Sequence, residues 1–266
     1  KVNEEVIEAI LGEEVFYEAI PSLIDKNLLS FENSLYDTHP LIKEFCYDKL
    51  ENKGQLHQKA ADYFISKREE KLDVTIEKQI FYHLKGFTNI PEIENSLNKY
   101  GRILVRQAYY DFVISLVEYL TTKNINHPFH DLLLGNINKI KGNWNKALSF
   151  YETVEKNNTD KELALESLLE IGDIFQSKGD ISKALDIYYQ SLEIARANNF
   201  QKYVAWAYNG IATIKKFYGE TDNALELHKK ALTISQDLGE KEDISALYNN
   251  IGSIYSEKGY YDEALK

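Results

Sequence analysis

Apolar and small residues recur at fixed offsets through the second half of the chain. Each of four segments has an apolar residue followed by Gly or Ala, then a glycine, then an Ala-Leu pair. The segments begin at Leu134, Ile171, Ile211 and Ile251, and their turn glycines are Gly142, Gly179, Gly219 and Gly259. These glycines are 37, 40 and 40 residues apart. A period of this length predicts helix pairs that stack into a solenoid.

Each repeat predicts an A helix and a B helix that meet at the turn glycine, where a positive φ is accessible to Gly. The expected A helices cover 160–178 and 200–218 and begin again near 241, and the expected B helices cover 181–197 and 221–238. Gly172, Ala212 and Gly252 are expected where A and B helices approach closely. Asp180 and Thr221 are candidate N-caps of the B helices. Tyr151 follows Ala147-Leu148, and Tyr188 follows Ala184-Leu185 at the same offset. Both tyrosines are expected to wedge between helices.

The first half does not follow this repeat. Helices are expected over 3–11 and 13–27, then a short hairpin around 32–34, then a helix that opens at His39-Pro40. This order of elements predicts a winged helix. Tyr110 aligns with Trp144 at a spacing of 34, which indicates a degenerate earlier repeat.

The predicted fold is therefore all-α, with a small winged-helix domain and its hairpin before a right-handed solenoid of long helix hairpins. The predicted domains are 1–50, a winged helix; 51–123, irregular helical hairpins; and 124–266, the repeats, of which the last is truncated.

Composition narrows the class of protein. The chain has 266 residues, a net charge of −11 and 44% hydrophobic residues, which predicts a packed interior and repulsion of phosphate backbones. The single Cys46 excludes an internal disulfide framework and favours a reducing cytoplasm. No apolar run is long enough for a transmembrane helix, so no membrane contact is expected. Because the sequence lacks Met, Lys1 is not expected to be a natural start, and the chain is expected to be a piece of a longer protein.

Motifs for chemistry are absent from the sequence. There is no G-x-x-x-x-G-K-[ST] loop, no G-x-S-x-G and no H-E-x-x-H. His127 and His130 form the one close histidine pair, and they lack a convincing third metal ligand. We expect no catalytic residues, no cofactor and no metal.

A solenoid works through its surface, and the concave face of this one is expected to be lined by A helices. By offset from the small residue, the lining positions are Glu166, Leu169, Asp173 and Gln176; Trp206, Asn209, Thr213 and Lys216; and Ala246, Asn249, Ser253 and Ser256. Asn209 and Asn249 are 40 residues apart, and amides at equivalent positions could hold the backbone of an extended peptide. Trp206 is the candidate aromatic anchor. The alternatives are solvated asparagines and a Trp206 that packs between A helices.

The repeat motifs resemble the tetratricopeptide repeat, whose pattern is W-x2-L-G-x2-Y…A-x3-F. The resemblance implies a scaffold that binds a protein or peptide in its groove. Two departures are the 40-residue period and the missing Pro at the end of each repeat. The Lys and Asn residues with which some members clamp a carboxyl terminus are also missing, since Leu169, Asp173, Thr213 and Ser253 stand at those positions.

Residues 13–86 resemble the winged helix and following helices of STAND-type signalling NTPases, which carry NACHT or NB-ARC modules. The resemblance rests on Leu28-Leu29, on His39 to Phe45 and on His57 to Tyr63. It implies the sensor or regulatory arm of a larger signalling ATPase, in which His39 reaches the nucleotide. The alternative for His39 is a histidine at a helix start that bonds to backbone.

A second hypothesis is a transcription regulator that uses the winged helix on DNA and the repeats as effector domain. The expected helix over 13–27 weighs against it, because it carries Glu13, Glu14, Glu18 and Asp25 against Lys26. An enzyme has no supporting feature. The ligand and the oligomeric state are not readable from the sequence.

Overall fold

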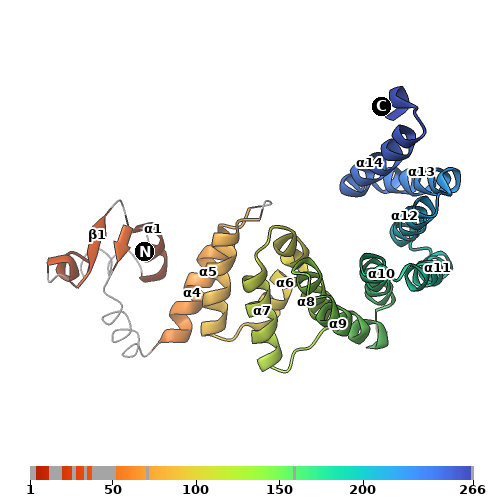
Figure 1. Ribbon diagram of the computed structural model, residues 1–266. Helices are drawn as coiled ribbons and strands as arrows, with labels where there is room; N and C mark the ends of the chain where they lie inside the picture. Colours follow the sequence, from red (N-terminus) through yellow and green to blue (C-terminus); the bar gives the residue numbers. More distant parts are fainter. Residues whose placement is uncertain are drawn as a thin grey trace. The chain divides into compact units, whose positions relative to one another are not determined.

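The computed structural model describes residues 4–11, 20–25, 28–32, 35–37, 52–69, 72–157 and 160–264. The chain divides into two compact units, residues 1–125 and 126–266. Across the described ranges every element is a helix except for one two-stranded hairpin (Figure 1). The expected all-α fold with a small hairpin is confirmed.

Unit 1 begins with helix α1 (Glu4–Leu11), a helical segment over 20–25, and strands β1 (Ser30–Glu32) and β2 (Leu35–Asp37). The strands are antiparallel with Phe31 opposite Tyr36, whose rings lie 4.5 Å apart. Ile20 and Tyr36 are buried in a small core with Ile7, Ile24 and Leu29 packed against them. The first helix and the hairpin are thus confirmed. The helix expected from His39 and most of the helix expected over 13–27 lie outside the described residues, so the winged helix stays a prediction.

The rest of unit 1 is a run of antiparallel helices, α4 (Lys53–Ser66), α5 (Val74–Gly86), α6 (Ile90–Arg106) and α7 (Tyr110–Thr122). Thr88, Ala108 and Asn124, which follow the ends of α5, α6 and α7, have a left-handed backbone conformation with φ of 59°, 63° and 61°. The turns of the repeats have glycine in this conformation. Helix α7 begins at Tyr110 just as α9 begins at Trp144, in agreement with the expected alignment of these two residues.

Unit 2 consists of helix pairs. Their bounds are α8 (Pro128–Ile140), α9 (Trp144–Asn157), α10 (Lys161–Ser177), α11 (Ile181–Ala197), α12 (Gln201–Phe217), α13 (Thr221–Leu238), α14 (Lys241–Glu257) and α15 (Tyr261–Ala264). These bounds confirm the expected A and B helices to within a residue or two. The turn glycines all have positive φ, from 75° at Gly142 to 83° at Gly179.

One of the two expected N-caps is confirmed. The Asp180 carboxylate accepts a hydrogen bond from the Lys183 amide at the start of α11. The prediction for Thr221 was wrong, because α13 already begins at Thr221 and Glu220 occupies the cap position. The turn at Gly219 places Glu220 one residue after the left-handed glycine, which is where Asp180 also lies.

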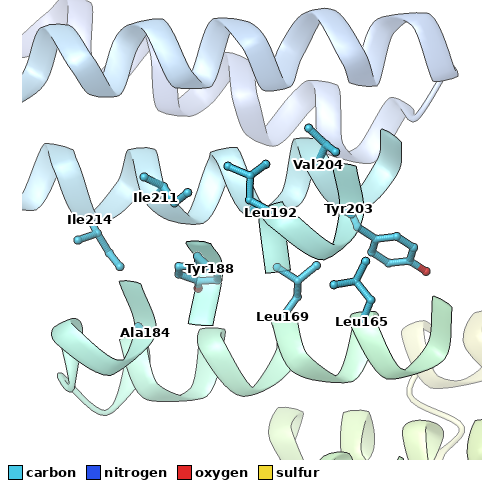
Figure 2. Close-up of a cluster of buried hydrophobic side chains, with 11 residues drawn as sticks. Leu165, Leu169, Ala184, Tyr188, Leu192, Tyr203, Val204, Ile211 and Ile214 are labelled. Carbon is cyan, nitrogen blue, oxygen red and sulfur yellow. The ribbon is translucent and has the colours of Figure 1, made fainter. Parts of the chain in front are cut away.

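The best-defined core of unit 2 joins successive repeats (Figure 2). It contains Leu165 and Leu169 from α10, Tyr188 from α11, and Ile211 and Ile214 from α12, each at most 2% exposed. Side chains from three consecutive helices therefore share one apolar interior, so no repeat buries its apolar face alone.

Small residues permit this packing. A Cβ atom on Gly172 would lie 2.9 Å from Cε1 of the Tyr188 ring, and a Cβ atom on Gly210 would lie 2.6 Å from Cζ of the same ring. The close approach expected at Gly172 is confirmed, and Gly210 of the next A helix is a second contact of the same kind. None of the helices that the structure describes is both long and apolar enough to span a membrane.

Candidate functional site

The A helices of unit 2 touch one another in succession: α8 contacts α10, α10 contacts α12, and α12 contacts α14. Each B helix packs against its own A helix and against the next one. We call α8, α10, α12 and α14 the A-helix row. The candidate binding residues of the sequence analysis all come from this row.

Two buried tyrosines of the B helices reach the row. Tyr151 packs on Gly135, where a Cβ atom would lie 2.5 Å from the ring, and its hydroxyl donates to Asn136 Oδ1 at 2.6 Å. Tyr188 packs on Gly172 and donates to Asp173 Oδ1 at 2.7 Å. Its hydroxyl also lies 2.8 Å from Gln176 Oε1. Burial raises the pKa of both phenols, so they stay protonated as donors. The expected wedge role of both tyrosines is confirmed.

His228 takes the corresponding place in the third repeat, 40 residues after Tyr188. It is 1% exposed, and its Nδ1 has no hydrogen-bond partner among the described residues. Burial, assisted by the charge of Lys216, lowers the pKa of His228 to about 4, so the ring is neutral at neutral pH. The third repeat therefore keeps a buried ring at this place, with a neutral imidazole instead of the phenol that donates to Asn136 or Asp173 in the first two repeats.

A charged cluster joins the first two A helices. Lys139 of α8 pairs with Glu170 and, at 2.9 Å, with Asp173 of α10. Burial raises the pKa of Glu170 to about 7 even though Lys139 opposes the shift. Lys139, Glu170 and Asp173 bond to one another, and Asp173 also accepts from Tyr188. These contacts hold α8 and α10 together.

Two of the predicted lining residues do not face a groove. Leu169 is fully buried in the core of Figure 2, and Glu166 is 4% exposed and accepts a hydrogen bond from the Tyr203 hydroxyl at 3.0 Å. The prediction for both residues was wrong. Leu169 precedes Gly172 by three positions, so both occupy the helix face that packs on the B helix. Neighbouring repeats press closely enough here to cover Glu166 as well.

The other predicted residues are partly or fully exposed, and several bond along the row. Asp173, Gln176, Trp206, Asn209, Thr213 and Lys216 are partly exposed, and Ala246, Asn249, Ser253 and Ser256 are exposed. Lys216 donates to Ser253 at 2.7 Å and pairs with Glu257 at 2.7 Å. Thr213 donates to the Asn209 carbonyl within its own helix.

The two equivalent asparagines have different surroundings. Asn209 accepts a hydrogen bond from the Asn250 amide at 3.0 Å, while Asn249 is exposed. Trp206 packs partly on the core of Figure 2, and its ring stacks on Tyr203 with centroids 6.4 Å apart. Trp206 thus packs against the core and is partly exposed, and its role as an anchor stays a prediction.

The histidine candidates offer no metal site. Among the residues that the structure describes, no group of three or more His, Cys, Asp and Glu side chains could hold a metal ion. His127 caps α8 by accepting from the Phe129 amide, and His130 is buried beside it. His39 lies outside the described residues.

The tetratricopeptide repeat family provides models that match residues 165–198 and residues 203–266. These segments are tetratricopeptide repeats. The sequence motifs and the helix pairs with glycine turns agree with this assignment in both segments. No curated protein sequence is significantly similar to the chain.

Solved structures of similar fold match nearly the whole chain, including the part outside these two segments. A Signal Transduction ATPase with Numerous Domains (STAND) protein with a tetratricopeptide repeat sensor, from Pyrococcus horikoshii, matches 99% of this chain at 18% identity and a TM-score of 0.63. This chain spans 41% of that longer protein. PlcR from Bacillus thuringiensis, solved in complex with the peptide PapR7 and DNA, matches 98% of this chain and 91% of its own at 14% identity and a TM-score of 0.55.

A Rap protein complexed with Competence and Sporulation Factor is a third structure of this kind. It covers 85% of this chain and 71% of its own at 18% identity and a TM-score of 0.55. At such identities these likenesses establish the fold alone.

Proposed function

We propose that the chain is a non-catalytic scaffold that binds a protein or peptide along the A-helix row of its tetratricopeptide repeats. The observation that carries the proposal is the combination, on α12 and α14, of a partly exposed Trp206 with the equivalent amides of Asn209, which is partly exposed, and Asn249. An aromatic anchor and an amide that both donates and accepts are suited to an extended peptide.

The hydrogen bonds along the row support this proposal because they preorganise it. Lys139 joins α8 to α10, and Lys216 joins α12 to α14. Helices held in this way lose less conformational entropy when a ligand binds. Two solved structures of similar fold, PlcR and the Rap protein, also contain a bound molecule named in their descriptions.

The test uses a peptide selected from a random displayed library on the full chain. Calorimetry with the wild type, Trp206→Ala and Asn249→Ala should give a dissociation constant that rises by about tenfold or more for Trp206→Ala, as for an interface anchor. Tyr189→Ala is the matched control, because Tyr189 is an exposed aromatic residue of the B helix α11. Equal affinity for Trp206→Ala and the wild type, or a loss with Tyr189→Ala alone, would contradict the proposal.

We further propose that the chain is the sensor arm of a larger STAND-type signalling NTPase in the cytoplasm. Support comes from the similarity in fold over 99% of the chain to a STAND protein more than twice its length. The coding sequence around Lys1 provides the test. A nucleotide-binding loop of the form G-x-x-x-x-G-K-[ST] upstream in the same reading frame is the expected result, and an intact gene without one would refute this part.

A further inference from the structure

Three lysines of unit 1 hold their ammonium groups over aromatic rings. Lys78 of α5 lies 5.5 Å from the centroid of Tyr109 and 5.9 Å from that of Phe112. Lys85, two turns further along α5, lies 5.2 Å from Phe81 and 5.3 Å from Tyr119. Lys123, which follows α7, lies 5.5 Å from the same Tyr119 ring. We call Lys78, Lys85 and Lys123 with Phe81, Phe112 and Tyr119 the lysine–aromatic face.

No carboxylate of the described residues pairs with the charges of this face. Some lysines in other places pair with carboxylates, for example Lys67 with Glu5 at 2.5 Å and Lys215 with Glu220 at 3.0 Å. In the described part of the chain, Lys78, Lys85 and Lys123 have no carboxylate within 4.0 Å of their ammonium groups. All three are exposed. The face therefore presents three positive charges in a chain whose net charge is −11.

Nearby acidic residues point elsewhere. Glu77 is buried and held by Arg68 at 2.8 Å. Asp111 and Glu118 of α7 each precede a ring of the face by one residue, so they lie about 100° round the helix axis from Phe112 and Tyr119. The local positive charge is therefore maintained where the rings are.

The aromatic part of the face is continuous. Phe81 contacts Phe112 and Tyr119 with ring centroids 5.7 and 6.0 Å apart, and all three rings are partly exposed. The Tyr119 hydroxyl is buried and has no hydrogen-bond partner among the described residues.

We propose that the lysine–aromatic face binds an acidic segment of a partner protein. Charge complementarity decides the class of ligand, since three cations without carboxylates flank an apolar surface. Lys78 and Lys85 are about 10 Å apart along the helix axis. Acidic residues three positions apart in a polyproline II segment share one face and lie about 9 Å apart, which matches this spacing. A nucleic acid fits less well, because its many phosphates would meet the negative charge of the remaining chain.

The test uses a short fluorescent peptide that contains Glu-Leu-Phe-Glu and is blocked at both ends, with the full chain as receptor. Fluorescence anisotropy at low ionic strength (about 10 mM) should show saturable binding, and the affinity should fall at about 150 mM salt. The triple variant Lys78→Gln, Lys85→Gln, Lys123→Gln should bind about tenfold or more weakly, as expected for three exposed ion pairs. The triple Lys→Arg variant should retain binding, since guanidinium groups keep both the charge and the contact with the rings.

The matched control replaces three exposed lysines on other elements, Lys59→Gln on α4, Lys146→Gln on α9 and Lys241→Gln on α14, and alters net charge by the same amount. It should leave the affinity unchanged. Absence of saturable binding by the wild type, or an equal loss in both Lys→Gln triple variants, would overturn the proposal. A single-stranded oligonucleotide of matched charge that binds more tightly and depends on the same three lysines would also overturn it, in favour of a nucleic-acid face.

Discussion

Tyr151 and Tyr188 occupy corresponding places in successive repeats, and each ring lies against a glycine of its own A helix. The sequence predicted this arrangement, because Gly135 and Gly172 share an offset from the turn glycine and both tyrosines share an offset from Ala-Leu. Gly210 could not be predicted in the same way. Its equivalents are Glu170 and Asn250, so no repeated small residue marks the position where the next A helix meets Tyr188.

Substitution of Gly135 by Ala tests this packing. The new Cβ atom would lie 2.5 Å from the Tyr151 ring, which is fully buried and has little room to move. We expect a loss of about 1–3 kcal/mol in the free energy of unfolding, as in other overpacked cores. Urea denaturation followed by circular dichroism measures it. Gly54→Ala is the control, because its Cβ atom would meet Phe87 at 3.9 Å and should not destabilise the chain.

The Glu170 carboxyl provides a test by pH. Burial raises the pKa of Glu170 from 4.5 to about 7 in the folded chain. The protonated side chain is favoured on folding, so its stabilising contribution is complete below the unfolded pKa and is lost as the pH rises through about 7. Glu170→Gln removes this titration. The free energy of unfolding of the variant minus that of the wild type should therefore increase as the pH is raised from 5 to 8, as measured by urea denaturation. A constant difference across that range would contradict the raised pKa of Glu170.

At the scale of the element, the helices of unit 2 could be placed from the sequence to within a residue or two, while those between 51 and 123 could only be described as irregular hairpins. The turns explain the difference. Unit 2 marks each A-helix end with Gly, whereas unit 1 has Thr88, Ala108 and Asn124 in the same left-handed conformation. No residue type then signals the end of the helix, and the side chains carry a steric cost of about 1 kcal/mol or more.

Replacement of Thr88 by Gly should relieve that cost. Thr88 is β-branched and has a φ of 59°, a conformation that glycine adopts without a clash. We expect the variant to gain about 0.5–1 kcal/mol, net of the greater entropy of glycine in the unfolded chain. Thermal unfolding measures the change. The control is Gln107→Gly, because Gln107 has a φ of −84° and gains nothing from glycine, so an increase in stability with both variants would argue against the turn as the cause.

At the scale of the whole molecule, the sequence predicted stacked helix pairs but described their exposed surface less well. Offsets from the small residue identified the A helices correctly as one row. They could not show which positions a neighbouring repeat covers, because Leu169 and Asn249 share an offset while one is fully buried and the other is exposed. Coverage depends on the neighbouring A helix: α12 packs on α10 and covers Leu169, whereas no A helix follows α14 among the described residues. The lysine–aromatic face was missed for a similar reason, since its residues come from two helices separated by α6.

Photo-crosslinking tests the central claim, that the A-helix row of the tetratricopeptide repeats holds a peptide, most directly. A library-selected peptide with a photoreactive group would be crosslinked to the full chain and the attachment sites read by mass spectrometry. The account predicts crosslinks on α12 and α14 near Trp206 and Asn249 that disappear when unlabelled peptide competes. Specific crosslinks confined to the B helices α11 and α13 or to unit 1, with none on the A-helix row, would contradict it.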